Sequence, residues 1–472
     1  MHCDFWKIGA AELSAAYREG SADPVAVAQE LAQRIEVLNP QINAYVALSP
    51  DLIEQAEASR ERYQDQRPAS PLDGVPVAIK DNLHVAGLPT AWGGETFGEV
   101  ATEDELPVAR LRSAGALLVG KTNTPEFAVE GYTGNARFGV TRNPWNIDLT
   151  PGGSSGGSVA AVAAGLATLA IGTDGGGSTR RPAGYTGLYG LKPGIGRIPR
   201  SGGLPQILMD FEVIGTFARG IDDLDLLHDA LARPDRADPT SRGIVPSAAS
   251  GDKLRVLSVP LLDGNPCDPE ILSATRTFAQ RLANLGHQVT EAELPIDLAR
   301  INDFWGAFAQ IGLAQLRESV PRMRAHSQKL YLDMAEAGAK IPAHRLFDAL
   351  NAVRDLRSDM SRLFADWDVI LMPTAAAQPW PAEQTHPTVI DGTEVGPRGH
   401  AVYTGWVNAA GHPSLAVPAG FDHRGLPIGC QLIGDLFAED RLIKLARELS
   451  AQNAPWRWPD LAYRSTGSPE ID

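Results

Sequence analysis

The sequence predicts an α/β protein in which helices sandwich a single large mixed β-sheet. Short apolar segments alternate with helical segments along most of the 472 residues, which is typical of layered α/β architecture. Hydrophobic residues make up 43% of the chain and charged residues 21%, an ordinary globular composition with ample material for a large core. We therefore expect one domain spanning residues 1–472.

Local patterns place the expected elements along the chain. Residues 10–38 predict two helices broken at Gly20-Ser21, with Pro24 at an early position of the second. Residues 75–79 predict an apolar strand that ends on Lys80. Further helices are expected at residues 106–114, 155–166 and 301–364, and further strands at 116–119, 168–172, 255–259, 288–290, 369–372, 414–418 and 428–433.

The segments fall into three parts and two long connections. We expect a helical N-terminal part at residues 1–65, a central core at 72–195 and a helical region at 300–365 that covers the pocket. Proline-rich surface loops are expected at residues 233–253 and 373–397.

Charge and composition exclude several classes of function. The formal net charge of −15, without a basic stripe, argues against nucleic-acid binding. The N-terminus lacks a signal-peptide pattern, and the longest apolar stretch, residues 159–171, is shorter than the roughly 20 residues of a membrane helix. Cys3, Cys267 and Cys430 fit neither a disulfide framework nor a metal spacing. We expect a cytoplasmic protein without cofactor, metal or membrane contact, and a homodimer is left open.

Two familiar motifs match by letters but not by context. Residues 115–122 fit the phosphate-loop pattern, yet the four residues that should form its turn are Ala-Leu-Leu-Val and predict a strand. Residues 152–156 fit the nucleophile elbow G-x-S-x-G, but no apolar strand leads into Ser154 and His412 lacks a supporting acid pattern. We reject both interpretations.

The richest chemistry lies in two glycine-dense turns that carry Ser154 and Ser178. The N–H groups of residues 175–178 are placed to converge on a developing negative charge, and such donors contribute about 3–4 kcal/mol each in known cases. Without a histidine triad, a lysine is the natural base, and Lys80 at the end of an apolar strand is a desolvated candidate. The alternative is a structural ion pair between Lys80 and Asp81.

Several ordered motifs together resemble the amidase signature family. They are Leu72-Asp73-Gly74-Val75-Pro76-Val77-Ala78-Ile79-Lys80-Asp81, Lys121-Thr122-Asn123, Arg142-Asn143-Pro144-Trp145, Gly152-Gly153-Ser154-Ser155-Gly156-Gly157, Gly172-Thr173-Asp174, Gly176-Gly177-Ser178 and Gly190-Leu191-Lys192-Pro193. The resemblance implies the amidase signature fold and hydrolysis of a small-molecule carboxylic amide through a serine acyl-enzyme.

The resemblance also implies roles for particular residues. Ser178 corresponds to the nucleophile, Ser154 to a bridging serine after a cis peptide, and Lys80 to the terminal base. Gly175, Gly176, Gly177 and Ala128 correspond to backbone positions around the oxyanion and the substrate.

Other side chains near these motifs have separate interpretations. Asp174 and Arg180 are expected to pair structurally. Arg181 stands where the family often has an uncharged residue, and we weigh a substrate-carboxylate contact against a structural role. Trp92, Tyr132 and Trp406 are candidate substrate contacts, with Phe127 and Trp305 as further possible pocket walls.

Two other functions remain as alternatives. The first is the glutaminase-like A subunit of a tRNA-dependent amidotransferase, which shares the signature. Against it, residues 316–364 lack the Arg- and Tyr-rich segment typical of that protein, and residues 403–406 depart from its acidic counterpart. The second is a non-catalytic binding protein, which the intact Lys80, Ser154 and Ser178 disfavour.

Overall fold

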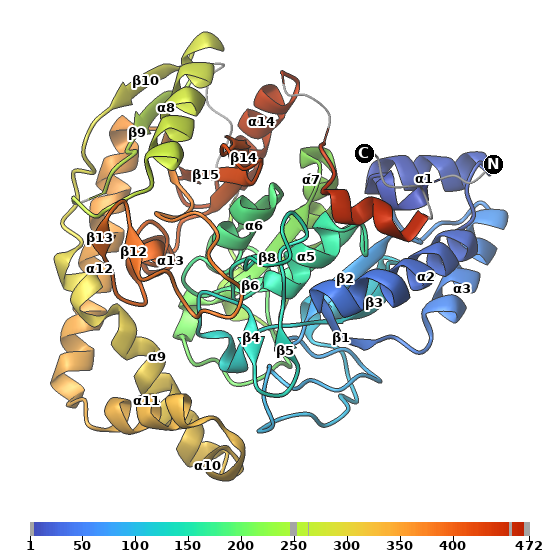
Figure 1. Cartoon of the computed structure of the whole chain (residues 1–472), viewed down its shortest axis with the longest axis horizontal. Helices are drawn as coiled ribbons and strands as arrows, with labels where there is room; N and C mark the ends of the chain where they lie inside the picture. Colours follow the sequence, from blue (N-terminus) through green and yellow to red (C-terminus); the bar gives the residue numbers. More distant parts are fainter. Residues whose placement is uncertain (1–3, 246–252, 263, 453–455, 467–472) are drawn as a thin grey trace.

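The computed structural model describes residues 4–245, 253–262, 264–452 and 456–466. Within these ranges eleven strands form one mixed sheet in the order β1-β3-β2-β6-β8-β7-β14-β15-β11-β9-β10, with helices on both faces (Figure 1). The predicted α/β class and single mixed sheet are confirmed. Cys3 and part of the predicted loop at 233–253 lie outside the described residues.

The strands of this sheet are short and mostly buried. They are β1 (Tyr45–Leu48), β2 (Pro76–Lys80), β3 (Leu117–Thr122), β6 (Leu169–Asp174), β7 (Tyr189–Lys192), β8 (Val213–Ala218), β9 (Arg255–Ser258), β10 (Gln288–Glu291), β11 (Val369–Pro373), β14 (Ser414–Phe421) and β15 (Pro427–Gly434). Two small hairpins lie apart from the sheet: β4 (Gly134–Asn135) with β5 (Gly139–Val140), and β12 (Val389–Ile390) with β13 (Thr393–Glu394).

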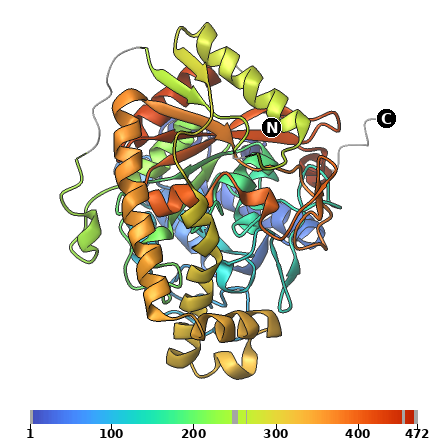
Figure 2. The same ribbon diagram turned by 90° about the vertical axis from the view of Figure 1, so that its left-hand side faces the viewer.

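The helices of the described chain largely match the predicted segments, and the predicted break at Gly20-Ser21 is confirmed. They are α1 (Ala10–Glu19), α2 (Pro24–Ile42), α3 (Leu52–Gln64), α4 (Leu106–Ser113), α5 (Gly156–Ala163), α6 (Arg180–Thr186), α7 (Ile221–Leu231), α8 (Pro269–Asn284), α9 (Ala299–Ser319), α10 (Met323–His326), α11 (Lys329–Ala339), α12 (Ala343–Asp366), α13 (Gly405–Ala410) and α14 (Glu439–Ser450). Figure 2 shows α9 to α12 as a helical wall along one side of the molecule.

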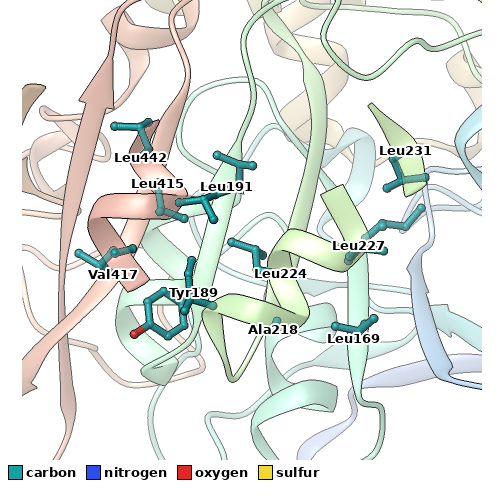
Figure 3. Packing of buried hydrophobic residues seen from close by; sticks show 14 of the residues in the cluster. Leu169, Tyr189, Leu191, Ala218, Leu224, Leu227, Leu231, Leu415, Val417 and Leu442 are labelled. Carbon is teal, nitrogen blue, oxygen red and sulfur yellow. The ribbon is translucent and has the colours of Figure 1, made fainter. Parts of the chain in front are cut away.

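Alternation along the strands divides the core into two layers. Val77 and Ile79 of β2 pack with α7 and α14 on one face, while Ala78 joins α2 and α5 on the other. Figure 3 shows the first layer, where leucines of α7 meet side chains of β6, β7 and β14. Lys80 has the same parity as Ala78, so its side chain points toward the α5 face.

The opposite face accepts helices built from small residues. Helix α5 reads Gly-Gly-Ser-Val-Ala-Ala-Val-Ala, and all eight of its residues are buried. Small side chains allow a helix to approach the sheet closely, which brings the turn before α5 down onto the ends of β2 and β6. This approach positions Ser154 beside Lys80.

Candidate active site

The site forms where two parallel strands end side by side. Strands β2 and β6 pair in parallel, with Ile79 opposite Ile171, so their carboxyl ends lie at the same edge of the sheet. Strand β2 ends on Lys80, and β6 runs through Thr173 into the glycine loop that carries Ser178. The fold thus joins motifs that are about a hundred positions apart in the sequence.

Lys80 is completely buried and surrounded by neutral oxygen atoms. Its Nζ lies 2.8 Å from Ser154 Oγ, 3.1 Å from Thr173 Oγ1 and 3.4 Å from the Thr173 carbonyl oxygen. No carboxylate forms an ion pair with it within the described residues. Burial lowers the pKa of Lys80 to about 7, against weaker upward effects of Glu212 and Asp174. The amine is therefore available in its neutral form near pH 7.

The alternative ion pair between Lys80 and Asp81 does not form. Asp81 instead pairs with Lys121, whose Nζ lies 3.2 Å from Asp81 Oδ1. Lys121 belongs to β3, and the residues that matched a phosphate loop are that buried strand. The rejection of the nucleotide-binding interpretation is confirmed, because those residues form no phosphate-cradling turn.

Ser154 sits in a tight turn held from both sides. The Gly153–Ser154 peptide bond is cis, as the resemblance implied. Thr133 Oγ1 donates to the Gly152 carbonyl at 2.9 Å and accepts from Gly156 N–H at 3.0 Å. Tyr132, a predicted substrate contact, presents its backbone to this turn, since a Cβ at Gly153 would overlap the Tyr132 carbonyl.

Asp174 organises the loop that carries Ser178. Its carboxylate accepts the N–H groups of Gly177 at 2.6 Å and Thr179 at 2.9 Å. The expected pair with Arg180 is confirmed, with both side chains buried and Arg180 Nη2 at 3.0 Å from Asp174 Oδ1. The Arg180 charge and these hydrogen bonds hold the pKa of Asp174 far below its usual range, against the effect of burial.

This arrangement changes the expected set of oxyanion donors. We expected the N–H groups of residues 175–178 to be available together, but Gly177 gives its hydrogen to Asp174. An aspartate three residues earlier can reach back to the loop, a local contact that the glycine pattern alone does not reveal. Among the described residues, the N–H groups of Gly175, Gly176 and Ser178 and the Ser178 hydroxyl have no hydrogen-bond partner.

Arg181 is buried and bonded to the same loop. Its Nη1 donates to the Gly176 carbonyl at 2.5 Å and to Thr404 Oγ1 at 2.7 Å. Burial lowers the pKa of Arg181 to about 10. Within the described chain it makes no ion pair, and its Nε has no hydrogen-bond partner. These contacts give Arg181 a structural position without testing the predicted carboxylate contact.

The predicted aromatic contacts occupy different environments. Trp92 and Trp406 are each only 2% exposed and pack into hydrophobic clusters. Ala128 follows Phe127, and both adopt left-handed backbone with φ of 57° and 56°, a conformation that is unusual outside glycine. Trp305 of α9 lies closest to the loop, because a Cβ at Gly176 would stand 3.6 Å from its indole.

Three polar contacts escaped prediction from the sequence. Thr173 belongs to a recognised motif but had no predicted role, although it holds the Lys80 amine. Thr404 and Asn408 bind the Gly176 carbonyl and Asp174 from more than 220 positions downstream. No local pattern marks such a contact, whereas the position of Thr173 near the end of a buried strand offered a weak signal.

The described residues contain one group with the geometry of a metal site, and no helix among them is long and apolar enough to cross a membrane. The group consists of Glu270, Asp422 and His423, at the turn between β14 and β15. Its polar atoms already bond to one another and to the turn: Asp422 accepts from the N–H of Leu426, and His423 Nδ1 lies 2.7 Å from Glu270. These bonds account for the group as a turn.

Comparison with known proteins identifies the family. The family model named Amidase matches residues 26–443. The chain belongs to the amidase family. The resemblance inferred from the motifs is thereby confirmed, and the chain is a hydrolase acting on the C–N bond of amides.

Similar proteins fit this placement. The putative amidase AmiA2 of Mycobacterium tuberculosis (strain ATCC 25618 / H37Rv) is 38% identical over 90% of this chain and 89% of its own length. The A chain component of the glutamyl-tRNA(Gln) amidotransferase of Synechococcus sp. (strain CC9605) is 34% identical over 88% of this chain and 90% of its own length.

Solved structures of amide hydrolases superpose closely on this amidase. A bacterial aryl acylamidase of the amidase signature family matches with a TM-score of 0.87 and 28% identity, covering 98% of this chain and 99% of that one. A 6-aminohexanoate cyclic dimer hydrolase with its substrate matches with a TM-score of 0.86 and 28% identity, covering 98% and 100%.

Proposed function

We propose that this amidase cleaves small-molecule carboxylic amides with Ser178 as nucleophile, Ser154 as proton bridge and Lys80 as base. The observation that carries the proposal is the 2.8 Å contact between the buried, unpaired Lys80 amine and Ser154 Oγ. A lysine with a pKa near 7 accepts a proton readily at neutral pH, which an ordinary lysine does not.

The chemistry proceeds in two balanced halves. As Ser178 Oγ forms a bond to the amide carbon, its proton moves to Ser154 while the Ser154 proton moves to neutral Lys80. The carbonyl oxygen becomes an oxyanion facing the unengaged N–H groups of Gly175, Gly176 and Ser178. The C–N bond then breaks, and the proton returns from Lys80 through Ser154 to the leaving amine.

Water completes the cycle by the same route. It attacks the acyl carbon while its proton passes through Ser154 to Lys80, and return of that proton to Ser178 Oγ releases the carboxylate product. Ser178 and Ser154 are 6% and 1% exposed, so the surrounding protein shields the reacting atoms from bulk solvent.

A fluorophosphonate probe and an amide panel test this proposal. Wild type is expected to label at Ser178 and to hydrolyse some of the aliphatic, aromatic and carboxylated amides, while Ser178→Ala neither labels nor turns over. The matched variant Ser155→Ala removes a neighbouring hydroxyl that bonds to the Thr173 carbonyl and should keep the label. Turnover by Ser178→Ala at the wild-type rate would overturn the proposal.

The second candidate is the glutaminase-like component of a tRNA-dependent amidotransferase, favoured by the 34% identity to such a protein. That function requires partner proteins and glutamine hydrolysis. If the purified chain hydrolyses glutamine in preference to every other amide and co-purifies with a partner, this candidate replaces the first. The homodimer and the cytoplasmic location remain predictions.

The carboxylate contact of Arg181 is a proposal about substrate choice. It is supported by a buried guanidinium without an ion pair among the described residues, which a bound anion would stabilise. Replacing Arg181 with Gln should lower kcat/KM more for a carboxylated amide than for its neutral analogue. An equal loss for both would leave only the contacts with Gly176 and Thr404.

A further inference from the structure

The peptide unit between Gly176 and Gly177 is held at both ends by side chains. Its carbonyl oxygen accepts Thr404 Oγ1 at 2.8 Å and Arg181 Nη1 at 2.5 Å. Its N–H group donates to Asp174 Oδ1 at 2.6 Å. Because a peptide unit is planar, fixing both ends fixes the orientation of its plane.

The donor and acceptor roles in this contact are determined by chemistry. A guanidinium carries only donors, so Thr404 Oγ1 must accept the 2.7 Å bond from Arg181 Nη1. The hydroxyl hydrogen of Thr404 then remains available for the Gly176 carbonyl. Its other acceptor, the Ala401 carbonyl, is more distant at 3.3 Å.

The loop needs such support because three glycines follow one another. Glycine gives the backbone more conformational freedom to lose than any other residue, so residues 175–177 have little intrinsic order. Gly177 adopts φ of 114°, and a Cβ there would overlap both Thr404 and Arg181. The same glycine that permits the close approach therefore leaves the loop dependent on it.

Helix α13 supplies the support from two residues at its start. Thr404 precedes the helix, and Asn408 lies one turn later, where its Nδ2 donates to the Asp174 carbonyl at 2.8 Å and to Asp174 Oδ1 at 3.0 Å. Both side chains are fully buried, so solvent does not replace either contact when it is removed.

From these contacts we infer that Thr404 is a positioning residue, which orients the Gly176–Gly177 peptide so that the flanking N–H groups of Gly176 and Ser178 face the oxyanion. The inference rests on the proposed function. Thr404 touches neither substrate nor reacting atoms in this role. It acts through the backbone of the loop, and its effect falls on the transition state, where the negative charge develops.

Replacing Thr404 with Val or Ser tests the inference. Val keeps the shape and removes the hydroxyl, so kcat should fall about 10- to 100-fold with KM within about twofold of wild type. Ser restores the hydroxyl and should retain kcat within about threefold of wild type. The acid limb of the pH profile should stay in place in both variants, because Lys80 keeps its contacts.

Controls separate this inference from the proposed function. Thermal melting of each variant checks folding, and Thr404→Ala serves if the Val variant does not fold. An inactive Ser178→Ala together with a Val variant that keeps wild-type kcat would overturn the positioning role alone. A fall in kcat that Ser does not rescue, or a change in KM alone, would also contradict it. An active Ser178→Ala would overturn the proposed function itself.

Discussion

Two buried lysines at the ends of neighbouring strands have different electrostatic surroundings. Strands β2 and β3 pair in parallel with Lys80 opposite Thr122 and Lys121 opposite Ile79. The offset of one residue places the two amines on opposite faces of the sheet. Each amine contacts three oxygen atoms, but Lys121 has the Asp81 carboxylate where Lys80 has the Ser154 hydroxyl.

The difference teaches how one chain builds both a structural and a reactive lysine. Burial lowers the pKa of both amines, and at Lys121 the Asp81 charge opposes this effect. Lys80 lacks such a partner among the described residues, so its neutral form is accessible near pH 7. The carboxylate next to Lys80 in the sequence is thus committed to the other lysine, on the other face.

The largest expected effect is on activity. Lys80→Met removes the proposed base and should lower kcat by about 10⁴-fold or more, as removal of a triad member does elsewhere. Lys121→Met removes a buried lysine of the same size from the opposite face and should keep the kcat of its folded fraction within about tenfold of wild type. Turnover by amidase preparations corrected for folded protein measures both, and equal losses would contradict the distinction.

Stability should change in opposite directions in the same two variants. Lys121→Met leaves Asp81 buried without its partner and should lower the free energy of unfolding by about 3–5 kcal/mol. Lys80→Met should raise it by about 1–3 kcal/mol at pH 7, because burying the Lys80 amine costs more than its neutral contacts return. Urea denaturation at several pH values measures both changes.

The sign of the pH effect follows from the lowered pKa of Lys80. Between about pH 7 and 10.5 the unfolded chain holds a proton on Lys80 that the folded chain has lost, so folding is disfavoured as pH falls through this range. The advantage of Lys80→Met should therefore be largest near pH 7 and below, and should shrink toward pH 10.5. An advantage that grows with pH would contradict the account.

A smaller effect is expected from giving Lys80 a carboxylate neighbour like that of Lys121. Asn82 is buried, and its Nδ2 donates to Thr173 Oγ1 at 2.9 Å, beside the Lys80 amine. Asn82→Asp should raise the pKa of Lys80 by roughly one to two units and lower kcat/KM at pH 7 about 10- to 100-fold, with recovery at higher pH. Asn82→Ala is the matched control, because it removes the amide without adding charge. Failure of Asn82→Asp to move the acid limb beyond Asn82→Ala would weaken the role assigned to charge.

Local patterns predicted the elements that build the site, and distant contacts escaped them. The strand that ends on Lys80 and the helix after Ser154 follow from apolar runs and glycine turns, which are local properties. Strands β7 and β8 escaped prediction, since fully buried short strands carry no alternation that distinguishes them from other apolar segments. The contacts of Thr404 and Asn408 depend on the packing of α13 against the loop, which no local pattern contains.

The pH dependence of kcat/KM for wild-type enzyme tests the central claim most directly. The account predicts a single acid limb in which kcat/KM rises about tenfold per pH unit and levels off above a pKa near 7, because neutral Lys80 is the active form. The limb should move upward in Asn82→Asp. A profile that is flat from about pH 5 to 8, or one that still rises through about pH 9, would contradict a neutral Lys80 as the base.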